Sequence, residues 1–135
     1  MNQLEANKAV VRQYVDAFNR GDTEALRRIF APEATVQGVL GAGGMEKVLA
    51  VWQELHAAFA NVLTVEQIIA EGDLLAVRYT ERGKFRGAFR GAAPTDKTFE
   101  VVALEWFVVR GGRIQQRWGA RDFAAIARQI GLPLN

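Results

Sequence analysis

The sequence contains no cysteine and only one histidine, His56, among its 135 residues. Without cysteine the chain can form neither a disulfide framework nor a thiolate nucleophile. A single histidine also leaves too few of the ligands from which zinc sites are built. We therefore expect no metal site in this protein.

Long apolar runs and a strong excess of one charge are missing too. No hydrophobic stretch approaches the length of a membrane-spanning helix, and the first residues, MNQLEANKAV, are not typical of a signal peptide. The 17 basic side chains are nearly balanced by 15 acidic ones, which argues against a nucleic-acid partner. We expect a cytoplasmic protein that binds neither a membrane nor a nucleic acid.

The sequence does have ample apolar material in regular patterns. Half of the residues are hydrophobic, so residues 1–135 are expected to form one domain around one core. The pattern predicts helices over residues 2–20, 23–30, 45–59 and 122–130, an extended segment followed by a flexible loop over 35–44, and strands over 62–70, 73–89, 98–110 and 113–120. Helices followed by an antiparallel meander indicate an α+β fold, with the helices on one face of a sheet.

Alternation along a strand predicts which side chains face the helices. In the last strand we expect the even-numbered residues to face inward, among them Trp118 and Asp122. The odd-numbered arginines of that strand are expected to face solvent. In the strand over 73–89 the odd-numbered residues are expected to face inward, and these include Tyr79 and Glu81.

The strand over 98–110 is apolar on both faces, which is typical of a strand buried on both sides. We assign the face that carries Glu105 to the helices. The other face then needs a second cover, and the sequence predicts a homodimer formed through the sheet.

Three carboxylates, Glu81, Glu105 and Asp122, are thereby expected on the helix-covered side. Carboxylates are rarely buried without a partner, so they indicate either a polar pocket or internal ion pairs. Low-dielectric surroundings would raise a carboxyl pKa and make the group a usable acid or base. The alternative for Glu105 is an ion pair with Arg78 or Arg117, and the alternative for Asp122 is the N-cap of the last helix.

Four segments, in this order, resemble the SnoaL-like polyketide cyclase family of the NTF2-like superfamily: NRGDTEALRRIFAPEA, IIAEGDLLAVRYT, GAAPTDK and GGRIQQRWGARDFAAIARQIG. The resemblance implies a cone, in which a curved sheet wraps around a pocket closed by helices, and it implies a dimer. It also implies an intramolecular aldol ring closure without a metal or organic cofactor. An aspartate serves as the acid–base catalyst in that family, and the W-x-x-x-D pattern of Trp118 and Asp122 places it at Asp122.

The chain departs from many relatives in carrying Gln37 where they carry a histidine. Gln37 can hydrogen-bond a ligand but cannot carry a proton at neutral pH. We expect a hydrophobic, oxygenated small molecule as the substrate, with Asp122 as the catalytic group. The residues expected to contact this molecule are Tyr14, Gln37, Trp52, His56, Tyr79, Glu105 and Trp118. Isomerisation is a close variant of this chemistry, and the competing hypothesis is a non-catalytic small-molecule-binding or dimerising accessory domain.

Overall fold

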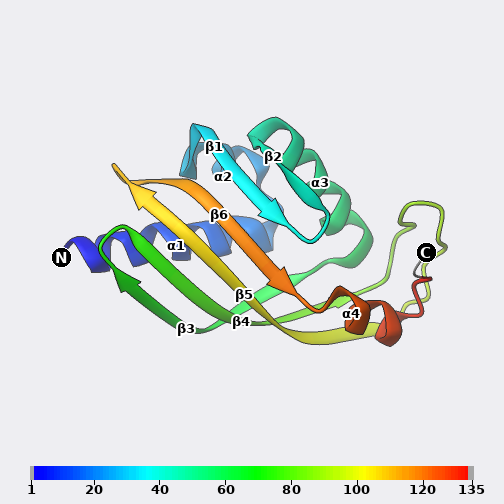
Figure 1. Cartoon of the computed structure of the whole chain (residues 1–135). Coiled ribbons are helices and arrows are strands. Elements are labelled where there is room, and N and C mark those ends of the chain that lie inside the picture. The colour runs from blue at the N-terminus through cyan, green and yellow to red at the C-terminus, as the bar shows by residue number, and fades with distance from the viewer. Residues whose placement is uncertain (1, 134–135) are drawn as a thin grey trace.

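The structure, a computed structural model, describes residues 2–133 of the chain. These residues form the helices α1 (Gln3–Arg20), α2 (Thr23–Ile29), α3 (Met45–Phe59) and α4 (Phe123–Ile130), and the strands β1 (Phe30–Gly38), β2 (Gly41–Gly44), β3 (Val62–Glu71), β4 (Leu74–Lys84), β5 (Thr98–Arg110) and β6 (Arg113–Arg121) (Figure 1). The predicted α+β class is confirmed. Within these described residues, no helix is both long and apolar enough to cross a membrane.

The six strands make one sheet in the order β2-β1-β6-β5-β4-β3. The predicted antiparallel meander is confirmed for β3 to β6, and the tight turn at Gly111 and Gly112 joins β5 to β6 with both glycines at positive φ. Residues 35–44 differ from the prediction, because they continue β1 and form β2 instead of ending in a flexible loop. The glycine-rich β2 has little strand propensity of its own, and its pairing with β1 overrides that deficit.

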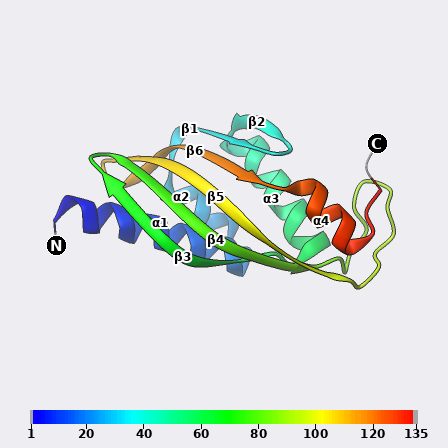
Figure 2. The ribbon, with the colours of Figure 1, turned by 60° about the horizontal axis from the view of Figure 1, so that its bottom comes forward.

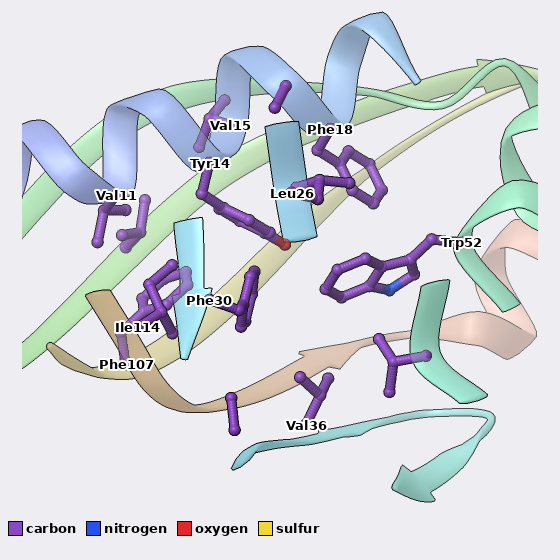
Figure 3. Packing of buried hydrophobic residues seen from close by; sticks show 14 of the residues in the cluster. Val11, Tyr14, Val15, Phe18, Leu26, Phe30, Val36, Trp52, Phe107 and Ile114 are labelled. Carbon is purple, nitrogen blue, oxygen red and sulfur yellow. The ribbon is translucent and has the colours of Figure 1, made fainter. Parts of the chain in front are cut away.

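The first helix covers the curved sheet along one face, and α4 lies at one end of it (Figure 2). Val11, Tyr14, Val15 and Phe18 of α1 recur at helical spacing and are buried. They meet Trp52 of α3 in one aromatic and aliphatic cluster, in which Tyr14 points away from its helix toward the sheet (Figure 3).

A second cluster of buried side chains lies around α4. The predicted strand over 73–89 ends at Lys84, but Phe85 and Phe89 in the following loop remain buried and pack with Phe59. The loop approaches α3 so closely that a Cβ on Gly87 would lie 2.8 Å from the Ala57 carbonyl oxygen. This packing closes the end of the sheet where α4 begins.

The predicted side-chain directions are confirmed in β4 and for the inward face of β5, but they are wrong for most of β6. Arg117 is only 4% exposed, whereas Trp118 is 39% exposed on the outer face. The cause is a β-bulge: Ile114 pairs with Val109 and Gln116 with Val108, which leaves one extra residue in β6. Beyond it the odd-numbered side chains face the helices, so arginines point inward.

Candidate functional site

An apolar cavity of about 80 Å³, partly open to solvent, lies between the inward face of the sheet and helix α3. Its wall is mostly hydrophobic, and α4 contributes Phe123 and Ile126 at one end. The apolar residues that line it on the other elements include Phe18, Val36, Val39, Leu40, Val48, Val51, Trp52, Leu55, Phe59 and Phe99. Such a concave, apolar space with a few polar groups is typical of a small-molecule site.

The polar part of this wall is built around Glu81 of β4 and Arg121 of β6. The Nε of Arg121 donates to Glu81 Oε1 at 2.7 Å, and the Asn61 side-chain amide donates to Glu81 Oε2 at 3.4 Å. Glu81 is buried, and all three residues line the cavity. A carboxylate and a guanidinium are thus held at the edge of an apolar space.

Behind this pair lies a second carboxylate, Glu105 of β5, whose side chain is fully buried. The hydroxyls of Tyr79 and Tyr14 donate to its Oε1 at 2.8 Å and 3.1 Å. Arg117 donates to Oε2, and Arg121 reaches the same oxygen at 3.5 Å. Arg121 therefore bridges Glu105 in the core and Glu81 in the cavity wall.

Arg117 reaches Glu105 because Gly119 leaves room for its guanidinium. Gly119 pairs directly with Glu105 across the two strands, and a Cβ on it would lie 2.6 Å from Arg117 Nη2. The guanidinium also lies 5.6 Å from the ring centre of Trp52 and donates to the Gln37 carbonyl oxygen at 3.3 Å. A glycine at position 119 is thus required by the buried arginine.

The charges of this cluster are fixed by its own contacts. Burial alone would raise the pKa of Glu105, but the positive charges of Arg117 and Arg121 outweigh it and hold the pKa below its usual value. Burial, with the adjacent Glu105 charge, raises the pKa of Tyr14 and Tyr79 above the ordinary tyrosine value. At neutral pH Glu105 is therefore ionised, and both tyrosines are neutral donors.

This arrangement can stabilise negative charge and accept a proton. A buried guanidinium beside an apolar cavity stabilises an oxyanion more strongly than it would in water. The Glu81 carboxylate lines the same cavity and is a candidate base. Among residues 2–133 no three histidine, aspartate or glutamate side chains come together as a possible metal site.

The structure places Asp122 at the N-cap of α4, where its Oδ1 accepts the Ala125 N–H at 2.9 Å. Asp122 is exposed and does not line the cavity, although its neighbours Arg121 and Phe123 do. The capping alternative is confirmed, and a catalytic role for Asp122 stays a prediction.

The predicted contact residues are distributed over several places. Trp52 lines the cavity, whereas Tyr14, Tyr79 and Glu105 lie buried behind its wall. Gln37 and Trp118 lie on exposed positions of β1 and β6, outside the cavity. His56 lies in a separate small depression, where a Cβ on Gly21 would be 2.8 Å from its Nε2.

Arg117, Arg121 and Asn61 were not predicted as site residues. The alternation of β6 assigned both arginines to solvent, because nothing in the local sequence marks the bulge. One signal was present: Glu105 in an otherwise apolar strand needs a cation, and the alternative partner Arg117 is confirmed. Nothing in the sequence marked Asn61 as a site residue, because it lies between a predicted helix and a predicted strand.

Comparison with known proteins identifies the fold. The family described as SnoaL-like polyketide cyclase matches residues 8–130. IdmH of Streptomyces antibioticus, a candidate polyketide cyclase, is 32% identical, with 93% of this chain and 98% of IdmH covered and a TM-score of 0.82. Candidate polyketide cyclases from a Jannaschia species and from Xanthomonas campestris give TM-scores of 0.87 and 0.88 at 22% and 19% identity. The match to the Jannaschia protein spans 99% of this chain and 98% of that protein, and the match to the Xanthomonas protein spans 95% of this chain and 98% of that protein. The cone expected from the sequence resemblance is confirmed.

The two buried tyrosines give a spectroscopic test of the cluster, since Tyr14 and Tyr79 are the only tyrosines in the chain. Their raised pKa values mean that folding stability is intact below the unfolded tyrosine pKa of about 10 and falls as pH rises above it. We expect no tyrosinate absorbance at 295 nm while the near-ultraviolet circular dichroism remains native. Both signals should change together on alkaline unfolding. A tyrosinate signal with a midpoint near that of the unfolded chain, in a protein still folded, would contradict the cluster.

Removing the charge of Glu105 tests whether the buried ion pair holds the fold together. Glu105→Gln leaves Arg117 buried without a counter-charge, and we expect a loss of about 3–5 kcal/mol in the free energy of unfolding. Glu100→Gln is the matched control on the same strand, because Glu100 pairs with Arg82 in solvent and its loss should cost at most about 1 kcal/mol. Urea unfolding measures both, and equal effects would contradict the assignment.

Proposed function

Because the chain belongs to the SnoaL-like polyketide cyclase family, we propose that it is a cofactor-free acid–base enzyme acting on a hydrophobic, oxygenated small molecule. The reaction is an aldol ring closure or a related isomerisation. The observation that carries this proposal is the apolar cavity that ends on the buried pair of Glu81 and Arg121. The apolar lining fits the hydrophobic body of such a molecule, and the Glu81–Arg121 pair fits its oxygenated, reacting end.

The chemistry needs a base and a stabiliser of negative charge. A carboxylate takes a proton from a carbon next to a carbonyl, and the electron pair moves to the carbonyl oxygen, which Arg121 stabilises. The enolate carbon then attacks a second carbonyl of the same molecule and forms the new bond. The resulting alkoxide takes the proton back from the carboxyl group. Substrate and product are isomers, so the reaction consumes no co-reactant.

Two carboxylates are candidates for the base. Glu81 is favoured by geometry, since it lines the cavity and is held there by Arg121 and Asn61. Asp122 is favoured by the family pattern, and it lies between Arg121 and Phe123, which both line the cavity. A pocket that only binds its ligand would need neither carboxylate as a base, so turnover separates this second hypothesis from an enzyme.

We also propose that the protein forms a homodimer through the outer face of the sheet. Ile69, Ala76, Trp106 and Trp118 lie opposite one another on four adjacent strands, and Ile69 is 68% and Trp106 47% exposed. A contiguous apolar surface of this kind favours association. These four residues form an apolar row across the sheet. A two-fold axis through this row would bury Trp106 and Trp118 of each copy against the same surface of the other copy.

The base can be identified by one ligand screen with variants of Glu81 and Asp122 and a control variant of Asp22. Polycyclic ketones, steroids and terpenoids are tested by thermal shift, and each hit is incubated with the protein and analysed for a product of unchanged mass and altered retention. We expect Glu81→Gln to lower turnover by about 10²-fold or more while binding persists. Asp122→Asn keeps the cap, because asparagine and aspartate cap equally well, and so reports on chemistry alone.

The matched control for Asp122 is Asp22→Asn. Asp22 caps α2 with nearly the same backbone angles and accepts the Ala25 N–H at 3.0 Å, but it does not line the cavity. Asp22→Asn should leave turnover unchanged. If Asp122→Asn abolishes turnover and Glu81→Gln does not, Asp122 is the base. If binding occurs without any isomeric product, the chain is a binding module.

The dimer is tested by placing a charge in the apolar row. We expect the wild type to sediment as a dimer and Trp106→Glu to sediment as a monomer, because burying two unpaired carboxylates at the interface is unfavourable. Leu4→Glu is the control, since Leu4 is an exposed apolar residue on α1. A wild-type protein that sediments as a monomer would rule out this interface.

A further inference from the structure

The cavity wall carries more positive than negative charge. The positively charged residues that line it are Lys47, Arg117 and Arg121, and the negatively charged one is Glu81. Arg121 is paired with Glu81, and Arg117 with Glu105 behind the wall. Lys47 forms no ion pair within residues 2–133, and its Nζ donates to the Ala42 carbonyl oxygen at 2.9 Å. One positive charge therefore has no carboxylate partner.

Two of these cations lie at the same end of the cavity. The guanidinium of Arg117 donates to the Gln37 carbonyl, and Lys47 donates to the Ala42 carbonyl. Gln37 of β1 and Ala42 of β2 are direct partners in the sheet. Both positive groups are thus anchored on adjacent residues of one short ribbon, which itself lines the cavity.

Two buried polar atoms in this wall have no hydrogen-bond partner. They are the Nε of Arg117, a donor, and the Oδ1 of Asn61, an acceptor. Their residues are 4% and 5% exposed, and both line the cavity. A buried donor without an acceptor is costly, so an anionic oxygen that came within reach of the Nε of Arg117 would be favourable.

From these contacts we propose that the cavity binds an apolar carboxylic acid, with its carboxylate next to Lys47 and Arg117. The ligand class is thus a carboxylate on a hydrophobic body. The inference rests on the proposed function, since it takes this cavity as the substrate site. It adds a specificity-determining residue, the exposed lining residue Lys47, to the buried pair of Glu81 and Arg121.

The test compares two flat apolar probes that differ only in charge, 2-naphthoate and its neutral isostere 2-naphthamide, by isothermal titration calorimetry at neutral pH. We expect the wild type to bind naphthoate about fivefold or more tightly than naphthamide, the ratio that one ion pair of about 1 kcal/mol supplies. Added salt should weaken only naphthoate. Lys47→Gln should reduce the ratio to about one.

Lys97→Gln is the matched control, because Lys97 is exposed in the loop before β5 and lies outside the cavity. It should keep the preference for naphthoate. Val51→Phe, which fills the cavity from α3, should weaken both probes, and unchanged naphthoate binding in it would place the acid elsewhere and overturn the inference. Equal binding of acid and amide to the wild type overturns the inference and leaves the proposed function standing. Binding of neither probe also overturns the inference, whereas the proposed function is decided by turnover of the screened ketones, steroids and terpenoids. A preference for naphthoate that survives Lys47→Gln overturns the role of Lys47.

Discussion

The buried carboxylate of Glu105 is the constraint on which the rest of the structure depends. An ionised carboxylate in an apolar core is very costly unless its oxygens are paired and hydrogen-bonded. Its partners come from three different elements, Tyr14 from α1, Tyr79 from β4 and Arg117 from β6. One side chain thereby joins the first helix to the middle of the sheet. Tyr14, which Figure 3 shows pointing from α1 toward the sheet, makes this link in addition to the apolar contacts of the helix.

The same cluster determines what the cavity can do. Arg121 shares its guanidinium between Glu105 and Glu81, so charge alternates from the core to the cavity wall. Because Arg121 is held by both carboxylates, its guanidinium needs little reorganisation when negative charge develops beside it. The site and the core are therefore one network, and any change that moves Glu105 also changes the contacts of Arg121 in the cavity wall.

Periodicity was enough to predict the helices and most strands, because long amphipathic segments have strong local signals. It failed where strand pairing decides the structure, and it also extended the strand over 73–89 beyond its observed end at Lys84. The segment GAGG forms β2 only because β1 lies beside it, and the extra residue in β6 is set by the offset between Ile114 and Val109. The error in β6 mattered more, because it placed Trp118 on the inward face instead of Arg117. The need of Glu105 for a cation was the one sequence feature that pointed to the correct side.

Asp122 shows why a family pattern and a local signal are hard to separate. Asp22 and Asp122 both precede a short helix, adopt similar backbone angles and accept the N–H three residues on. Capping therefore explains an aspartate at either position without any chemistry. What distinguishes Asp122 is its place between two cavity-lining residues, whereas Glu81 is in the wall itself. If the fold depends on the charged network, the proposed ligand choice rests on the apolar lining and on the exposed Lys47, which can vary without unfolding the core.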